Sequence, residues 1–255
     1  MPGRLAGKVC VITGTGGSMG RATALAFARE GAHVVGCDVA VEPAEETVEL
    51  VHAAGGEIVS LQPCRLSDPA DCAKLVELAL SEFGGIDVLF NLAGRSHFGW
   101  LEDVTDEDWD TARQDEVDLI FYLTRAAWPH LIASRGAVVN MASLNGQLSF
   151  KSLASLSHTT NKAAIIGMTR QLAMEGGEHG VRVNSISPGL IQSGATRAHL
   201  DDGVSGFARE MLERTVLGRL GEPEDVANLA LFLSCDESSY ITGVDVVIDG
   251  GMKVW

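Results

Sequence analysis

With 255 residues, of which 46% are hydrophobic, the chain is long enough to bury a large core as a single domain. Its formal net charge of -15 argues against binding to nucleic acid or to an anionic membrane through a broad charged surface, because both would be repelled. We therefore expect a small-molecule substrate, with no nucleic-acid partner and no membrane partner.

Cysteine usage and hydropathy indicate the cellular compartment of the protein. The five cysteines are scattered and include no Cys-x-x-Cys pair, so they predict neither a disulfide framework nor a zinc site. The N-terminus has no apolar signal segment, and no run approaches the roughly 20 apolar residues that a membrane span requires. We expect a cytoplasmic protein with reduced, mostly buried thiols.

Short runs rich in valine and isoleucine alternate with helix-length amphipathic segments. This alternation is typical of an α/β domain in which helices cover both faces of a parallel sheet. In chain order we predict strands over 9–13, 33–37, 57–61, 88–91, 137–141, 182–187 and 244–248, and helices over 19–30, 43–54, 68–83, 106–133, 155–177 and 223–234. The prediction is a single doubly wound domain over residues 1–255 with a seven-stranded parallel sheet.

The stretch over approximately 190–215 is less regular than the rest of the chain. It follows a predicted strand whose carboxyl end should border the ligand crevice of an open α/β sheet. We therefore expect a substrate lid there.

A glycine-rich turn follows the first predicted strand and opens the first helix, with the sequence Thr13-Gly14-Thr15-Gly16-Gly17-Ser18-Met19-Gly20. Glycines let the backbone approach a pyrophosphate closely, and the positive end of the following helix favours its charge. Glycines also serve ordinary strand-to-helix turns, so the turn by itself is a weak signal.

Asp38 strengthens the dinucleotide interpretation. It stands at the end of the second predicted strand, 18 residues beyond Gly20, where a carboxylate can accept hydrogen bonds from a ribose diol. The same carboxylate would repel a 2′-phosphate, so NAD is favoured over NADP. The alternative is that Asp38 is only a turn residue at a strand end.

Several further motifs extend over the chain. They are Asn91-Leu92-Ala93-Gly94, Asn140-Met141-Ala142-Ser143, Lys162-Ala163-Ala164, Arg182-Val183-Asn184-Ser185-Ile186-Ser187-Pro188-Gly189 and a C-terminal Asp249-Gly250-Gly251. Through them the sequence resembles the short-chain dehydrogenase/reductase family over essentially its whole length. The resemblance implies a Rossmann fold, an NAD(H)-dependent oxidoreductase activity and a homo-oligomer, by default a tetramer.

The resemblance also implies where the cofactor binds, with Ile191 and Ser193 at the nicotinamide amide. Together with Asp38, the expected cofactor-binding residues are Gly14, Ser18, Met19, Gly20, Arg65, Leu66, Asn91, Ala93, Gly94, Lys162, Pro188, Gly189, Ile191 and Ser193. Some depart from the family pattern. Ser18 replaces a glycine of the turn, and Arg65 replaces an aspartate that usually meets the adenine amine; we expect Arg65 to stack on the adenine.

The catalytic positions are the most unusual part of the sequence. Similar proteins use a tyrosine four residues before a lysine, a serine after the fifth strand and an asparagine on the preceding long helix. Ser143 and Lys162 match this pattern, but His158 occupies the tyrosine position and Glu116 the asparagine position. A family variant with its tyrosine seven residues before the lysine is unsupported, because Ser155 stands there.

Glu116 and His158 are expected to act together. Glu116 shares an apolar helical stripe with Ile120 and Leu123, so it should face inward and meet His158 or Lys162. An imidazole exchanges protons near neutral pH. We predict that neutral His158 takes the hydroxyl proton in alcohol oxidation, while Ser143 orients the oxygen and Lys162 holds the nicotinamide ribose.

Two alternatives stay open. The substitutions at 116 and 158 can be drift in a site that has lost hydride chemistry, or they can serve a non-redox NAD-binding protein, such as a lyase, an isomerase or a dinucleotide sensor. No metal is predicted, because none of the remaining histidines that we considered forms a metal-ligand spacing with a second ligand; these are His97, His130, His179 and His199.

Three segments are expected to form the substrate pocket, over 95–101, 144–157 and 193–212. They combine bulky apolar residues with a few cations, namely Phe98, Trp100, Phe150, Phe207, Met211, Leu212, Arg95, His97, Lys151 and Arg197. This mixture suits an apolar molecule that carries one polar or acidic group, although it also suits ordinary loop packing.

Overall fold

The computed structural model describes residues 2–193 and 206–255, and at 206–208 it describes the backbone alone. Its centre is a seven-stranded parallel sheet in the order β3-β2-β1-β4-β5-β6-β7. The strands are β1 (Val9–Thr13), β2 (His33–Cys37), β3 (Glu57–Leu61), β4 (Val88–Asn91), β5 (Ala137–Met141), β6 (Arg182–Pro188) and β7 (Asp245–Ile248). The predicted seven-stranded doubly wound sheet is confirmed, and strand ends differ from the predicted ones by a single residue in β6 and β7.

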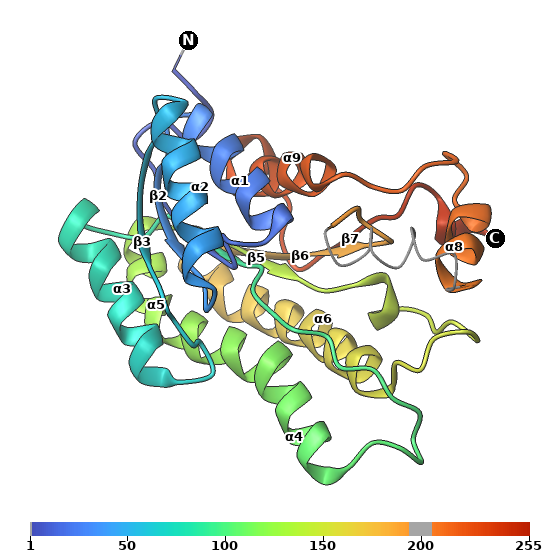
Figure 1. The fold of residues 1–255 in the computed structure, drawn as a ribbon. Coiled ribbons are helices and arrows are strands. Elements are labelled where there is room, and N and C mark those ends of the chain that lie inside the picture. The colour runs from blue at the N-terminus through green and yellow to red at the C-terminus, as the bar shows by residue number, and fades with distance from the viewer. Residues whose placement is uncertain (1, 194–205) are drawn as a thin grey trace.

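Helices cover both faces of the sheet (Figure 1). One face carries α1 (Ser18–Arg29), α2 (Val41–Ala53) and α9 (Pro223–Ser234); the other carries α3 (Pro69–Phe83), α5 (Leu119–Ser134) and α6 (Leu156–Gly177). The remaining elements are α4 (Asp106–Arg113), α8 (Gly206–Arg214) and the short 3-10 turns η2 (Leu144–Gly146), η3 (Asp236–Ser238) and η4 (Met252–Val254).

Strand alternation explains why the core has two halves. In β1, Val9 and Val11 pack with α3 and α5 on one face, while Cys10 and Ile12 pack with α1 and α9 on the other. Successive side chains of a strand point to opposite faces, so a strand buried on both sides is apolar at every position. The unbroken apolar runs in the sequence have this cause.

Local signals fix several helix starts. Asp68 accepts a hydrogen bond from the backbone N–H of Ala70 at the start of α3, and Pro69 occupies the first helical position. Thr105 and Asp108 form a reciprocal capping box at the start of α4. These caps agree with the predicted starts to within one residue.

The predicted helix over 106–133 is interrupted, which corrects the prediction of one continuous helix. Between α4 and α5 lies η1 (Gln114–Asp118), a turn of π-helix. A π turn widens the helix and often accompanies a functional site. The apolar spacing did not reveal it, because the buried positions on either side still follow an α-helical stripe. The turn contains Glu116.

The middle of the expected lid, over 194–205, falls outside the described residues. Within the described part of 190–215, Ile191 pairs in an isolated parallel bridge with Gly221, and α8 follows at Gly206–Arg214. Its role as a lid remains a prediction.

Candidate active site

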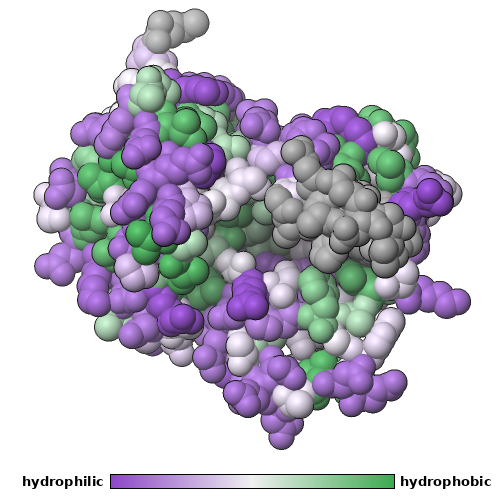
Figure 2. All heavy atoms as spheres, viewed as in Figure 1, coloured by the Kyte–Doolittle hydropathy of each residue, from purple (hydrophilic) through white to green (hydrophobic). Residues whose placement is uncertain are grey.

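A cavity of about 690 Å³ opens at the carboxyl ends of the central strands. The strand order reverses between β1 and β4, and open α/β sheets bind ligands at such a switch point. Figure 2 shows the surface hollowed near the middle of the corresponding face. Ten of the expected cofactor-binding residues line the cavity: Gly14, Ser18, Met19, Gly20, Asp38, Arg65, Leu66, Ala93, Gly94 and Ser193.

The glycine turn leaves the backbone N–H groups at the start of α1 without a side-chain cap. A Cβ on Gly20 would lie 2.0 Å from the carbonyl oxygen of Gly14, so no larger residue fits there. The N-cap is Gly17, which has no side chain to cap the helix, and the first turn carries no acidic residue. The backbone N–H groups of this helix end are therefore suited to an anion, and the cradle fits a dinucleotide pyrophosphate.

Asp38 is held rigidly at the edge of the cavity. Its Oδ2 accepts a hydrogen bond from the N–H of Gly16 (2.8 Å), and its Oδ1 accepts one from the N–H of Ala40 (2.9 Å). Each carboxylate oxygen can accept more than one hydrogen bond, so both retain capacity for hydroxyl donors. The glycine turn and Asp38 thus form one unit.

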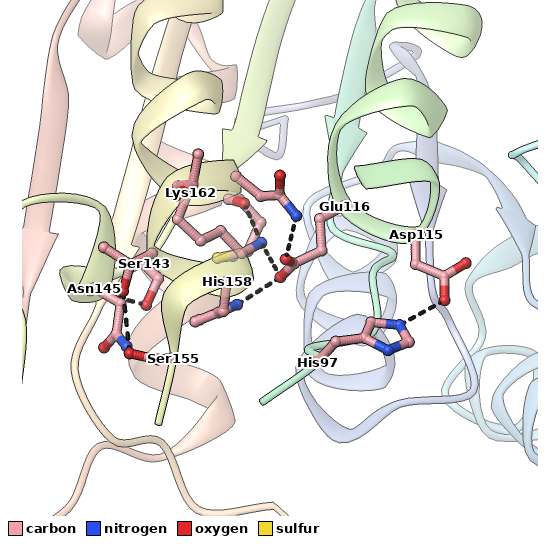
Figure 3. Close-up of polar contacts among 12 residues, drawn as sticks. His97, Asp115, Glu116, Ser143, Asn145, Ser155, His158 and Lys162 are labelled. Carbon is pink, nitrogen blue, oxygen red and sulfur yellow. Dashed lines mark hydrogen bonds and ion pairs between the residues drawn. The ribbon is translucent and has the colours of Figure 1, made fainter. Parts of the chain in front are cut away.

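A second polar group forms where η1 packs against α6. Glu116 is only 1% exposed, and its Oε1 lies 2.6 Å from Nδ1 of His158. Its Oε2 accepts a hydrogen bond from Nδ2 of Asn161 at 3.1 Å, and Nζ of Lys162 lies 3.8 Å from Oε1 (Figure 3). The expectation that Glu116 faces inward and meets His158 or Lys162 is confirmed.

Lys162 has two oxygen neighbours. Its Nζ donates a hydrogen bond to the carbonyl oxygen of Met141 at the end of β5 (3.0 Å) and faces Glu116. Burial lowers the pKa of the Lys162 ammonium below its ordinary value, and the Glu116 carboxylate acts in the opposite direction. The carboxylate and the ammonium therefore compensate each other's charge in a site that excludes most water.

His158 is held on two sides. Nδ1 faces Glu116, and the ring of Phe98 lies against the imidazole with centroids 5.5 Å apart and planes tilted by 56°. The side chain is 10% exposed. Since Nδ1 is engaged by the carboxylate, Nε2 is the nitrogen left for proton exchange with a ligand.

Ser143 lies two residues after the end of β5 and is the N-cap of η2. Its Oγ accepts a hydrogen bond from the backbone N–H of Asn145 (3.2 Å). In Figure 3, Ser143 and Asn145 lie on one side of His158 and Glu116 lies on the other.

Comparison with known proteins gives consistent relatives. A family model described as Enoyl-(Acyl carrier protein) reductase matches residues 14–253. The 2,5-dichloro-2,5-cyclohexadiene-1,4-diol dehydrogenase LinX of Sphingobium indicum is 38% identical, covering 100% of this chain and 99% of that protein. The crystal structure of a short-chain type dehydrogenase/reductase from Mycobacterium marinum superposes with a TM-score of 0.88 at 29% identity, covering 98% of this chain and 96% of the other.

The chain belongs to the short-chain dehydrogenase/reductase family. A further structural relative is a 7α-hydroxysteroid dehydrogenase complexed with NADH and 7-oxo glycochenodeoxycholic acid, with a TM-score of 0.90, 30% identity, and coverage of 97% of this chain and 95% of the other. The family members named in these comparisons are oxidoreductases, which supports an enzymatic role for this chain. The NADH in the steroid dehydrogenase complex supports a nicotinamide dinucleotide cofactor.

Five expected cofactor residues lie outside the lining of the main cavity. Asn91 is fully buried, and its Nδ2 donates to Thr124 and Asn140, which ties β4 to α5 and β5. Ile191 lines a separate cavity of about 240 Å³. The others are Lys162, Pro188 and Gly189, near the ends of β5 and β6. In this short-chain dehydrogenase/reductase, Asn91 has a structural position beneath the site.

Three polar contacts near the site were not predicted from the sequence. Asn161 bonds Glu116, and His97 Nε2 lies 2.9 Å from Oδ2 of Asp115, which also lines the cavity. The Oγ of Thr13 accepts the N–H groups of Leu92 and Ala93. The position of Asn161, three residues after His158 on the same helix face, was a usable signal. The sequence carried no comparable signal for the pairing of His97 with Asp115.

The expected substrate segments are partly brought together. Gly99 donates its N–H to the carbonyl oxygen of Ala154 (2.7 Å), so the first two segments lie side by side. Phe98 is 58% exposed beside His158, whereas Phe150 is buried against Met211. The side chains of Phe207 and Arg197 lie outside the described residues.

Two further observations concern the described residues alone. They contain no cluster of three or more His, Cys, Asp or Glu side chains placed to hold a metal ion. Within the same part of the chain, every helix is too short or too polar to cross a membrane.

Proposed function

We propose that the chain is an NAD(H)-dependent oxidoreductase that interconverts a secondary alcohol and a ketone on a small, largely apolar substrate. The observation that carries the proposal is the buried pair that Glu116 of η1 forms with His158, which lies on the same helix as Lys162. His158 stands where similar proteins place the tyrosine that exchanges the substrate proton. A carboxylate on Nδ1 of an imidazole is an established arrangement for general acid–base catalysis.

The choice of NAD rests on the edge of the main cavity. Asp38 faces the cavity with both oxygens fixed by backbone N–H groups, and a fixed carboxylate accepts ribose hydroxyls but repels a 2′-phosphate. Gly14, Ser18 and Gly20 would hold the pyrophosphate at the start of α1. When bound, the nicotinamide supplies the acceptor or donor of the hydride.

The side chains divide the proton chemistry among them. In alcohol oxidation, Nε2 of His158 accepts the proton of the substrate hydroxyl. Glu116 accepts the Nδ1–H hydrogen bond (2.6 Å) and stabilises the imidazolium that forms. Ser143 orients the substrate oxygen, and Lys162 holds the nicotinamide ribose while it balances the charge of Glu116. In ketone reduction, the imidazolium returns the proton.

A cyclic secondary alcohol is the substrate class that we favour. Phe98 presents aromatic surface beside His158, and Trp100, two residues further along the chain, is also more than half exposed. The names of two relatives refer to cyclic alcohols, a chlorinated cyclohexadienediol and a hydroxysteroid. We further propose a cytoplasmic homo-oligomer, by default a tetramer, as similar proteins form.

Incubation with NAD and a panel of cyclic secondary alcohols, followed by NADH fluorescence, tests the proposal. We expect turnover that falls by about 10²–10⁴ in His158→Ala, the range that general acid–base groups contribute. His179→Ala is the matched control, because that imidazole is partly exposed beside Glu178 and should leave turnover unchanged. Tight NAD binding without turnover of any alcohol, together with activity gained in His158→Tyr, would contradict the proposal.

A further inference from the structure

The amide of Asn161 is the least expected member of the buried polar group. The side chain is 5% exposed and donates through Nδ2 to Oε2 of Glu116 (3.1 Å). Asn161 lies three residues after His158 and directly before Lys162, so an imidazole, an amide and an ammonium from about one turn of the same helix surround a single carboxylate. The proton-transfer mechanism described above gives the amide no role.

His158 and Lys162 compete for the same carboxylate oxygen of Glu116. Oε1 accepts from Nδ1 of His158 at 2.6 Å, and the ammonium of Lys162 lies 3.8 Å from the same oxygen. A buried ammonium attracts a carboxylate strongly, because little water screens the pair. Rotation of the carboxylate toward Lys162 would remove the acceptor from His158. A hydrogen bond on Oε2 resists that rotation, since it fixes the plane of the carboxylate.

We propose that Asn161 is a positioning residue for His158: its amide anchors Oε2 of Glu116, so that Oε1 retains the Nδ1–H of the imidazole and Nε2 remains the nitrogen that exchanges the substrate proton. The inference rests on the proposed function for its catalytic meaning. The structural part of the proposal is that Asn161 fixes the Nδ1–H tautomer of His158. This part can be tested whether or not the protein turns over an alcohol. The partner of one imidazole nitrogen determines which nitrogen carries the proton.

The decisive substitution is Asn161→Leu, which removes the donor while it keeps a branched side chain of similar size. The carboxylate then loses its anchor, and we expect it to turn toward Lys162. His158 should populate both neutral tautomers instead of one. We also expect kcat to fall at least about tenfold with the KM for NAD unchanged, because a misplaced proton acceptor affects the chemical step.

Nitrogen NMR of the full-length protein with ¹⁵N-labelled histidine measures the tautomer directly. The chain has seven histidines, and His158→Gln removes and thereby assigns the relevant signals. Spectra are recorded over a pH series, and the tautomers are compared in the spectra that show a neutral imidazole. The wild-type protein should show the proton on Nδ1 alone, and Asn161→Leu should show a mixture. This readout does not respond to a general loss of stability.

Asn184→Leu is the matched control. Asn184 is equally buried and joins β6 to Ile241 and Val244, distant in the chain from Glu116. It should lower the unfolding temperature without a change in the His158 tautomer. If Asn161→Leu does not fold, as judged by circular dichroism, Asn161→Ala replaces it with the same expectation.

Two results would overturn the proposal. One is a mixture of tautomers in the wild-type protein; the other is an unchanged Nδ1–H tautomer in the folded Asn161 variant. If the wild-type protein oxidises no alcohol, the proposed function fails, but the NMR comparison still decides whether Asn161 sets the tautomer.

Discussion

At the residue scale, the site pairs a buried carboxylate with an imidazole. An imidazole at position 158 needs a partner that fixes its ring, and the carboxylate of Glu116 supplies it at 2.6 Å. A carboxylate this deeply buried needs compensation, and Asn161 and Lys162 supply it. Either residue without the other would leave a polar group poorly satisfied. The two residues therefore form one paired unit.

Glu116→Gln tests that unit. The amide is nearly isosteric but removes the negative charge that stabilises an imidazolium, so we expect kcat to fall by about 10²–10⁴ while NAD binding stays unchanged. Steady-state kinetics with the alcohol that the wild-type protein oxidises provides the measurement. Glu178→Gln, on an exposed carboxylate, is the control. If the kcat of the Glu116→Gln enzyme lies within twofold of the wild-type kcat, the carboxylate of Glu116 has no role in the chemical step.

Asp38→Ala tests the cofactor preference. Loss of the carboxylate removes the acceptors for the ribose hydroxyls and the charge that would repel a 2′-phosphate. We expect weaker NAD binding, by about tenfold or more for a lost pair of charge-assisted hydrogen bonds, and a smaller gap between NAD and NADP. Calorimetric titration with both dinucleotides measures this. Equal affinities of the wild-type protein for NAD and NADP would refute the assignment.

At the scale of elements, the π turn η1 connects the long helices to the site. It places Glu116 against α6, while the next residue toward the N-terminus, Asp115, faces His97 and the main cavity. Two adjacent carboxylates thus serve two different imidazoles. In a regular α-helix neighbouring side chains diverge by about 100°, and the wider turn changes the direction in which both point.

Deletion of Val117 from η1 should convert the wide turn to a regular one. Glu116 would then rotate by about 100° relative to α5 and lose His158, so turnover should fall as it does in Glu116→Gln while helix content by circular dichroism persists. Thr105→Ala is the control on the neighbouring α4, because loss of its cap costs about 1 kcal/mol of stability without moving Glu116. Unchanged turnover after the deletion would show that the π turn is dispensable.

At the scale of the whole molecule, all five cysteines are buried and free, as the sequence predicted. Burial raises the pKa of the Cys72 thiol to about 12, above that of an exposed thiol. The folded state therefore holds this proton more tightly than the unfolded state does. Its contribution to stability is complete below the pKa of the unfolded thiol, near 8.5, and declines as the pH rises toward 12.

Two measurements follow for Cys72. Alkylation by iodoacetamide at pH 8 should be slow in the folded protein and fast after denaturation, as intact mass reports. Denaturant melts should show that Cys72→Ala loses less stability than the wild-type protein between pH 8.5 and 11. Rapid alkylation of Cys72 in the native state, located by peptide mass, would contradict its burial.

The sequence was sufficient for much of the fold because local patterns carry it. Valine-rich runs, caps such as Asp68 and the glycine turn each reflect short-range geometry, and the strands and helices appear within one or two residues of their expected ends. The π turn was not predictable, since it changes one hydrogen-bonding step without a change in apolar spacing. The contact of His97 with Asp115 was equally hidden, because it joins a loop to a helix.

The sequence alone determined the architecture, the glycine cradle and the identity of the unusual residues at positions 116 and 158. Only the tertiary structure decided how these residues meet: which carboxylate oxygen faces Nδ1, and that Asn161 holds the other oxygen. The physical reason is the separation along the chain of the residues that interact. Periodicity and caps act over a few neighbouring residues, whereas the Glu116 contacts join residues 42 and 45 positions apart, which packing of η1 against α6 brings together.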